Sequence, residues 1–220
     1  MKRKIVYLAA FLGLIFTSCE DRRVENKFKS TEKQQTAKSI RSNVDTVASS
    51  NKEFGDTVYN ILQAFKNKNQ ESLNELVSKE YGVIILFRTG VFNEYKHLDK
   101  IDFSDPSLQS LSPSADIRDL ILKYENLPKF NCGTMEWDKY GLFCDTINKD
   151  TLISGTPQNL IKYRGDKIAV SEVKKLKDLE AQSRRVVFAH PGQGFIFYLT
   201  LFDGKWYLTA IDRVTTDCSA

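Results

Sequence analysis

The sequence predicts an α+β domain in which N-terminal helices pack on a mostly antiparallel sheet that ends in a long C-terminal hairpin. Three observations lead to this fold class. Apolar residues recur at helical spacing just after residue 50, buried strand-like runs follow, and the chain closes with two long aromatic strands around Asp203-Gly204. Helices and strands that are segregated along a chain are typical of the α+β class.

The first helix is expected over residues 51–66, because the serines directly before it favour a helix start. The alternative is one long helix over residues 37–66. Apolar residues recur in steps of three and four from Ile40 to Phe65, with Asn51 as the polar member of the seam. In the first case the preceding residues are a tether, whereas in the second they belong to the helix.

Shorter elements are expected between the first helix and the middle of the chain. They are a short helix around Leu73–Val77, a buried strand over Val83–Phe87 with a turn at Thr89-Gly90, a Ser- and Pro-rich loop over 104–114, and a short helix around Ile117–Ile121. Apolar residues three and four positions apart predict helices, whereas β-branched and aromatic runs bounded by glycine predict strands.

Two further helices are expected in the second half of the chain. Thr156-Pro157 predicts a helix start that leads to Tyr163, because proline suits the first helical position. Ser171 is expected to cap another helix that ends near Ser183, with its charged residues in solvent. The buried side of that helix is predicted to carry three apolar residues, Val173, Leu176 and Leu179.

The cysteines after residue 19 allow one disulfide in an oxidising compartment. Met135–Trp137 and Leu142–Ile147 flank a turn-forming stretch and are predicted to pair with each other. In that register Cys132 and Cys144 point to opposite faces, which disfavours a bond between them. The expected disulfide therefore joins Cys218 to either Cys132 or Cys144.

The clearest folding signal is Asp203-Gly204, a pair that favours the two-residue type I′ turn of a hairpin. Phe195–Phe202 and Lys205–Ile211 are its expected strands, and Val186–Ala189 is expected to add a third antiparallel strand. In this register one apolar face pairs Leu201 with Trp206, Leu199 with Leu208, and Phe197 with Ala210. That face is predicted to be core.

The opposite face of the hairpin is the candidate ligand face. It carries Tyr198, Thr200, Tyr207 and Thr209, with Tyr198 opposite Thr209 and Thr200 opposite Tyr207. Aromatic rings beside hydroxyl groups can hold a small ligand or a partner loop. The alternative is that one of the protein's own helices covers this face.

The chain begins with a basic stretch over residues 2–4, followed by an unbroken apolar run from Ile5 to Phe16 and then Thr17-Ser18-Cys19. A charged start, an apolar middle and small residues before a cleavage site are typical of a secretory signal. A helix of this length rises only about 18 Å, which is too short for a bilayer core of about 30 Å. The run is therefore not expected to span a membrane.

The end of this run resembles the lipobox of bacterial lipoproteins, which ends in a cysteine that is acylated after the chain is cut before it. Thr17 and Ser18 match the motif, whereas Phe16 stands where the family usually has Leu. The resemblance implies a signal peptide over residues 1–18 and lipidation at Cys19. Several acyl chains anchor a protein to a membrane almost permanently.

This resemblance also implies a domain organisation and a location. A lipidated N-terminus and polar tether would occupy residues 19–50, and a single globular α+β domain residues 51–220. Glu20 and Asp21 resemble the acidic signals that send some lipoproteins of Gram-negative bacteria to the outer face of the outer membrane, while Arg22 and Arg23 interrupt that pattern. The expected location is the outer membrane, on either its periplasmic or its exposed side.

The order of helices followed by a sheet also resembles the cystatin-like roll of nuclear-transport-factor-type proteins. The Asp-Gly-Lys-Trp turn over residues 203–206, which leads into the last strand, is part of this likeness. The resemblance implies a roll-like fold and no functional residue.

Composition argues against two classes of function, nucleic-acid binding and metal binding. Without residues 1–19 the chain has 29 Lys and Arg against 28 Asp and Glu, so it is nearly neutral and has no basic footprint for nucleic acid. A hydrophobic content of 41% is that of a globular domain. No metal is expected, because the two histidines, His97 and His190, lie far apart and form no ligand motif.

The sequence therefore predicts a non-enzymatic, lipid-anchored domain that binds an envelope protein or a small ligand without a cofactor. One alternative is a structural or assembly subunit, if residues 40–65 form an exposed helical seam that oligomerises. The other is an envelope hydrolase acting on glycan, peptide or lipid. It requires a pocket that brings together two of four candidate groups, Cys144, His190, Asp145 and Glu136.

Overall fold

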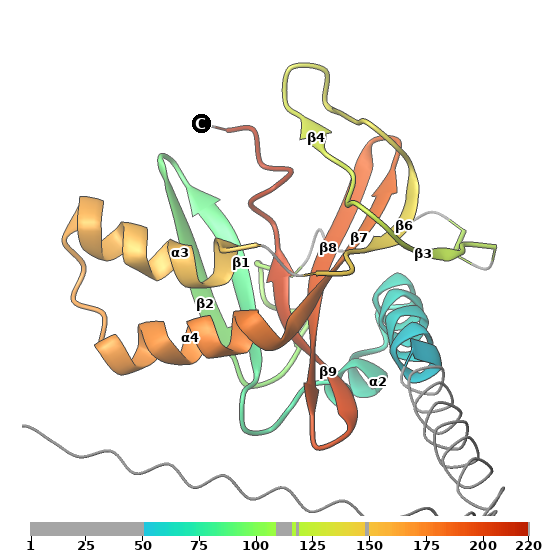
Figure 1. The fold of residues 1–220 in the computed structure, drawn as a ribbon, viewed down its shortest axis with the longest axis horizontal. Helices are drawn as coiled ribbons and strands as arrows, with labels where there is room; N and C mark the ends of the chain where they lie inside the picture. Colours follow the sequence, from blue (N-terminus) through green and yellow to red (C-terminus); the bar gives the residue numbers. More distant parts are fainter. Residues whose placement is uncertain (1–50, 109–115, 118, 148–149, 220) are drawn as a thin grey trace, which may run out of the picture. The chain divides into compact units, whose positions relative to one another are not determined.

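The computed structural model describes residues 51–108, 116–117, 119–147 and 150–219. The predicted signal peptide, Cys19, the tether and most of the alternative long helix therefore lie outside the described residues. The described residues belong to one compact unit with a central seven-stranded sheet. Figure 1 shows helices on both sides of this sheet.

The described residues begin with a helix over residues 51–66, which ends where both sequence alternatives place the end of the first helix. Its buried residues recur at intervals of three and four, so they form one apolar stripe: Phe54, Val58, Ile61, Leu62 and Phe65. The short helix α2, Gln70–Asn74, follows and buries Leu73. The Asn69 side chain caps α2 by accepting a hydrogen bond from the Ser72 N–H at 3.1 Å.

The sheet is mixed but mostly antiparallel, with the strand order β2-β1-β9-β8-β7-β6-β3. The pairs β1–β9 and β3–β6 are parallel, and the other neighbours are antiparallel. A separate two-stranded sheet pairs β4 with β5. The strands are β1 Val83–Thr89, β2 Phe92–Leu98, β3 Leu122–Tyr124, β4 Phe130–Asn131, β5 Glu136–Trp137, β6 Gly141–Cys144, β7 Ser183–His190, β8 Gln193–Phe202 and β9 Lys205–Asp212.

Side-chain alternation along the strands divides the apolar residues between the two faces of the sheet. On β1, Val83 and Ile85 face the helix over residues 51–66, and Ile84 and Leu86 face the other side. The second face is covered by α3, Leu152–Asn159, and α4, Val170–Gln182, which contribute Ile153, Leu176 and Leu179. The α+β prediction is confirmed, with the sheet between two helical layers (Figure 1).

The C-terminal hairpin forms around Asp203-Gly204, and both residues have positive φ angles, as a type I′ turn requires. Leu201 pairs with Trp206 and Leu199 with Leu208, as predicted. The register then shifts because Thr209 is an extra residue on β9. Thr200 also pairs with Tyr207, as predicted, because this pair precedes the shift. The two predicted pairs beyond it are wrong: Tyr198 lies opposite Ala210 rather than Thr209, and Phe197 lies opposite Ile211 rather than Ala210.

The predicted hairpin between Met135–Trp137 and Leu142–Ile147 is wrong. Trp137 pairs with Phe130, and their rings meet edge to face at 5.1 Å. Strand β6 instead lies between β7 and β3, where Leu142, Phe143 and Cys144 are all buried. A two-stranded hairpin could not bury both faces of β6, so the larger sheet is preferred.

Two of the predicted helices also differ from what the structure has at those residues. Around Ile117–Ile121 the described residues are not helical, and strand β3 follows directly. Helix α3 begins at Leu152 rather than at Thr156, so Pro157 lies inside it. The earlier start is possible because the buried Glu180 carboxylate of α4 accepts the N–H groups of Ile153 and Ser154 at 2.6 and 3.2 Å.

Helix α3 continues into a π-helical turn, η1, Leu160–Arg164, which ends at Gly165 in a left-handed conformation. Helix α4 buries Leu176 and Leu179 as predicted, while Val173 is half-buried. Most of its charged residues are exposed, whereas Glu172 is half-buried and Glu180 is buried. Among the described residues no helix is long and apolar enough to cross a bilayer.

Candidate functional site

Most of the predicted ligand face lies beneath α3 and α4. Tyr198, Thr200 and Thr209 are buried, and only Tyr207 is partly exposed. The hydroxyl groups of Ser183, Thr200 and Thr209 form a buried chain with spacings of 2.6 and 2.7 Å. The alternative of a helix-covered face is therefore the arrangement that the structure has, and three of these four side chains cannot meet a ligand.

The same sheet face continues past the helices at the hairpin tip, where it is hollowed. The Phe202 ring stacks on Tyr81 with centroids 4.2 Å apart and an interplanar angle of 8°. The Tyr207 ring lies 6.2 Å from Phe202. Between the Tyr81 and Phe202 rings and α4 is a cavity of about 430 Å³ with Leu179 among its lining residues, which we term the aromatic cleft. Small-molecule sites typically have volumes of roughly 300–1,000 Å³.

Local sequence explains how the stacked pair is held. Phe202 directly precedes the Asp203-Gly204 turn and therefore ends β8 at the hairpin tip. Tyr81 lies in the loop before β1, where its N–H donates to the Ser78 hydroxyl at 3.4 Å. Gly82 has φ +64°, and a Cβ there would lie 2.5 Å from the Leu98 carbonyl oxygen. Only glycine fits next to Tyr81 without moving the backbone.

Polar side chains of α4 form the rim of the aromatic cleft. They supply both hydrogen-bond donors and acceptors, and they are Ser171, Lys174, Lys175, Asp178 and Gln182. Lys174 and Asp178 form an ion pair one helical turn apart. Lys175 makes no ion pair with the described part of the chain, and its Nζ lies 5.5 Å from the Tyr81 ring centroid.

Charges near the hairpin tip also affect the pKa of the Tyr81 hydroxyl. The Glu80 carboxylate raises the pKa of the Tyr81 hydroxyl above its ordinary value, and burial and Asp203 act in the same direction. Tyr81 is therefore a neutral phenol at physiological pH. On the other side, Lys205 Nζ lies 5.0 Å from the Tyr207 ring centroid. The aromatic cleft thus combines the neutral Tyr81 and Phe202 rings with Lys174 and Lys175 of α4, while Lys205 and Tyr207 lie outside its lining.

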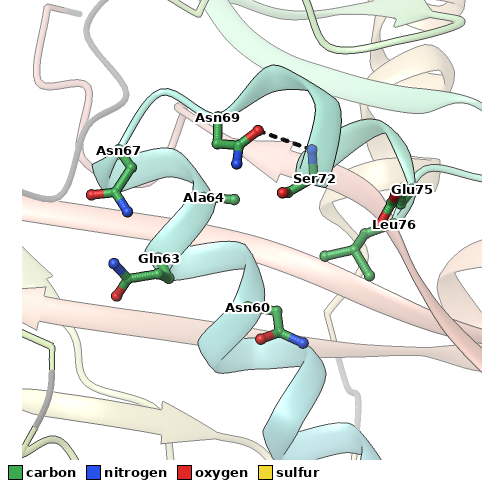
Figure 2. A pocket seen from close by; sticks show the side chains of 8 residues that line it. All are labelled: Asn60, Gln63, Ala64, Asn67, Asn69, Ser72, Glu75 and Leu76. Carbon is green, nitrogen blue, oxygen red and sulfur yellow. Dashed lines mark hydrogen bonds between the residues drawn. The ribbon is translucent and has the colours of Figure 1, made fainter.

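A second hollow of about 280 Å³ lies between the helix over residues 51–66 and α2 (Figure 2). Its polar lining includes the exposed carboxamides of Asn60, Gln63 and Asn67, which project from one side of the helix. Ala64 and Leu76 provide its small apolar surface. No aromatic ring lines this groove, which we term the amide groove, so it offers a ligand much less apolar contact than the aromatic cleft.

A third hollow of about 280 Å³ adjoins a network of charged groups around Arg185. The Arg185 guanidinium bonds Asp212 and Thr215 and pairs with Asp150 at 3.1 Å, and the Asp212 side chain is fully buried. Burial raises the pKa of the nearby Asp145 carboxyl. Because the charges of Arg185, Asp150 and Asp212 are already paired with one another, we interpret this network as a structural link between β7 and β9.

The candidate hydrolase groups do not meet. Cys144 is buried, and burial raises the pKa of its thiol to about 12, so it is not a thiolate nucleophile. Cys144 pairs with Val186, which is four residues from the exposed His190 and hence about 13 Å away along the strand. Glu136 is exposed on the separate sheet of β4 and β5. The pocket that the hydrolase alternative requires is not formed by these residues.

No group of three or more potential metal ligands occurs among the described residues. His97 on β2 instead forms a hydrogen bond with Glu172 of α4, with His97 Nε2 and Glu172 Oε1 2.8 Å apart. His190 lies at the exposed end of β7. Each histidine thus has a different environment, and neither lines the aromatic cleft.

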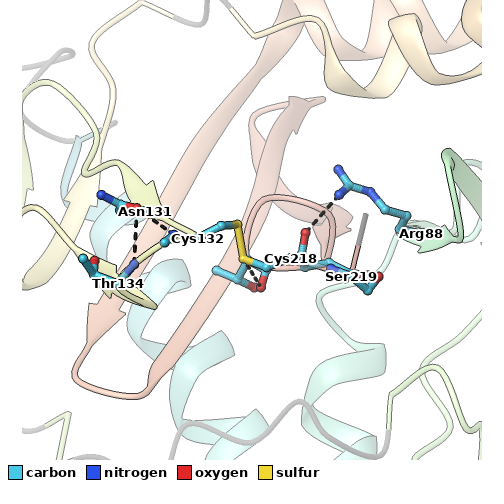
Figure 3. The surroundings of a disulfide bond; sticks show 9 residues. Arg88, Asn131, Cys132, Thr134, Cys218 and Ser219 are labelled. Carbon is cyan, nitrogen blue, oxygen red and sulfur yellow. Dashed lines mark hydrogen bonds between the residues drawn. A yellow bond between two sulfur atoms is a disulfide. The ribbon is translucent and has the colours of Figure 1, made fainter.

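The disulfide joins Cys132 to Cys218, one of the two pairings that the sequence left open (Figure 3). The argument against a bond between Cys132 and Cys144 relied on a hairpin that does not form, and Cys144 is a buried free thiol in the sheet. The bond connects the loop between β4 and β5 to the C-terminal tail. Arg88 also holds this tail by donating to the Asp217 carbonyl oxygen at 3.0 Å.

Sequence reasoning placed Tyr207 on a candidate site but missed Tyr81 and Phe202. The sequence predicts Phe202 only as a strand residue, although its position beside the turn places it at the hairpin tip. Tyr81 had one local signal, the adjacent Gly82, because a glycine before a buried strand can indicate a close backbone approach. Its contact with Phe202, 121 positions along the chain, has no sequence signature.

Comparisons of the chain with protein-family models, with curated proteins and with solved structures found no match in any of the three.

Proposed function

We propose that this chain is a lipid-anchored protein of the bacterial outer membrane whose domain binds a small ligand in the aromatic cleft and catalyses no reaction. The observation that carries the proposal is the cleft itself. It has an apolar floor of Tyr81, Leu179 and Phe202, a polar rim and the volume of a small-molecule site.

The anchoring part of the proposal rests on the sequence and is supported by the disulfide. The apolar run that ends at Cys19 resembles a lipobox, which implies export before lipidation. The bond between Cys132 and Cys218 agrees with export, because structural disulfides persist in oxidising compartments such as the periplasm. A domain tethered through Cys19 would work in water close to the membrane surface.

A small ligand is favoured over a protein partner by the shape and composition of the site. Protein interfaces of ordinary strength bury about 800 Å² on each partner. Figure 1 shows α4 lying across the sheet, and the aromatic cleft occupies the limited space between this helix and the hairpin tip. Leu179 is buried and the two rings are half-buried beside the α4 side chains that line the cleft, which suits a small ligand.

The ligand-binding part can be tested with a low-molecular-mass extract of the protein's own cell envelope. The chain from residue 19 onward, carrying Cys19→Ser, is equilibrated with the extract and washed, and retained compounds are released by denaturation and identified by mass spectrometry. We expect a compound that is retained by this protein and by a control with Asn60→Ala in the amide groove, but is lost with Phe202→Ala. No specifically retained compound, or equal retention by Phe202→Ala, would contradict the proposal.

The anchoring part needs a separate measurement on the full-length chain in cells. Mass spectrometry of the N-terminal peptide should show a chain that begins at Cys19 and carries acyl groups. An unmodified Cys19, or a chain that still begins at Met1, would remove the membrane anchor from the proposal while leaving the cleft in place.

A further inference from the structure

We propose that the aromatic cleft binds a saccharide, with the ring of an uncharged sugar lying against the Tyr81–Phe202 pair. This inference rests on the proposed small-ligand function and specifies the chemical class of the ligand. It follows from the orientation of the rings, the charges beside them and the chemistry of the rim.

The stacked pair provides an apolar surface rather than a slot between rings. The rings of Tyr81 and Phe202 are stacked nearly parallel, with an interplanar angle of 8° and centroids 4.2 Å apart, so no ligand ring fits between them. A ligand contacts their outer faces and edges instead. The π face of an aromatic ring is electron-rich, and the C–H groups on one side of a sugar ring are slightly positive, so the two surfaces attract.

The lysines disfavour cationic ligands. Lys175 Nζ lies 5.5 Å from the Tyr81 ring, and Lys205 Nζ lies 5.0 Å from the Tyr207 ring. The cation–π position over Tyr81, the one of these two rings that lines the cleft, is thus already occupied by Lys175, and a cationic ligand would meet like charge there. A ligand with hydroxyl or acidic groups gains hydrogen bonds from the same ammonium groups.

The rim disfavours a purely hydrocarbon ligand. Lys174 supplies donors, Asp178 supplies acceptors, and Gln182 supplies both. A hydrocarbon that covered these groups would displace water without replacing its hydrogen bonds, which costs free energy for each group. Sugar hydroxyls are both donors and acceptors, so a saccharide can lie on the rings and still satisfy the rim.

The test uses two chitotriose probes that differ in charge. Triacetylchitotriose is uncharged, whereas the fully deacetylated trimer carries ammonium groups. We titrate each into the chain from residue 19 onward with Cys19→Ser and follow amide and aromatic NMR signals, with maltotriose as a second uncharged probe. We expect saturable shifts at Tyr81, Phe202 and Gln182 with at least one uncharged trisaccharide, and at least tenfold weaker binding of the deacetylated trimer.

Two variants separate stacking from general loss of structure. Phe202→Leu keeps an apolar side chain but removes the ring, and we expect it to weaken binding by roughly 2- to 12-fold. Tyr163→Leu removes an aromatic ring that is 63% exposed on η1, outside the cleft, and should leave binding unchanged. The unbound NMR spectrum of each variant shows whether the fold is retained.

Three results would overturn the saccharide inference: no saturable binding of either uncharged trisaccharide, unchanged binding in Phe202→Leu, or binding of the deacetylated trimer as tight as that of triacetylchitotriose. The outcome for the proposed function is read separately from the extract experiment. If a compound other than a saccharide is retained there and lost with Phe202→Ala, the small-ligand function stands and the saccharide assignment fails. If nothing is retained in that experiment and neither uncharged trisaccharide binds, both fail.

Discussion

The disulfide between Cys132 and Cys218 should supply a large part of the domain's stability. The two cysteines are 86 residues apart, so the bond closes a long loop in the unfolded chain. In the chain-entropy model a loop of this length lowers the entropy of the unfolded state by about 15 cal/mol/K, or about 4.6 kcal/mol at 25 °C. We expect the double substitution Cys132→Ser and Cys218→Ser to lower the free energy of unfolding by about 3–4.5 kcal/mol.

Guanidinium unfolding followed by tryptophan fluorescence measures this loss. Both tryptophans are buried, Trp137 on the small sheet near the bond and Trp206 in the main core, so both should report unfolding. A reducing agent should bring the wild-type chain to the midpoint of the double variant and leave the double variant unchanged. The variant should also show a steeper dependence on denaturant, because its unfolded state is less compact.

The reasoning is refuted if the wild-type chain unfolds at the same denaturant concentration with and without the reducing agent. It is also refuted if the double variant loses less than about 1 kcal/mol, because the loop model cannot produce so small an effect without compensating strain. Cys144 is present in every sample, so its thiol cannot account for a difference between them.

Three further predictions concern buried groups. Glu180→Ala should cost about 1–3 kcal/mol, because it leaves the Ile153 and Ser154 N–H groups without an acceptor, and Glu180→Gln should cost less; thermal unfolding compares the two. Native Cys144 should resist alkylation at pH 8 and react on unfolding, and because burial raises its pKa to about 12 from an ordinary 9.0, its contribution to stability should fall as pH rises from 9 toward 12. Rapid alkylation of the folded chain would contradict this. Gly194→Ala should destabilise by about 1–3 kcal/mol, because its Cβ would lie 2.7 Å from the Trp137 ring; an unchanged melting temperature would show that this packing is loose.

The fold class was predictable because its strongest signals are local. The Asp203-Gly204 turn sets the start of the hairpin, and the apolar stripe from Phe54 to Phe65 sets the first helix. The extra residue at Thr209 could not be predicted, because a bulge has no strong sequence signal and one inserted residue exchanges the faces of every side chain beyond it.

Long-range contacts account for the other differences. Helix α3 begins early because Glu180, 27 positions away from Ile153, supplies acceptors that no residue near its start provides. Strand β6 leaves the predicted hairpin because β7 offers it a more deeply buried position. The aromatic cleft could not be predicted either, because it also depends on a long-range contact. Tyr81 and Phe202 belong to separate segments and meet only after the hairpin has packed beside the loop before β1.

The most direct test of the account is a crystal structure of the chain from residue 19 onward, with Cys19→Ser, grown in the presence of triacetylchitotriose. The account predicts electron density for a sugar ring against the outer face of Tyr81 or Phe202, with its hydroxyls within hydrogen-bonding distance of the α4 rim. Density for the sugar only in the amide groove or at the Arg185 network, with an empty aromatic cleft, would contradict it.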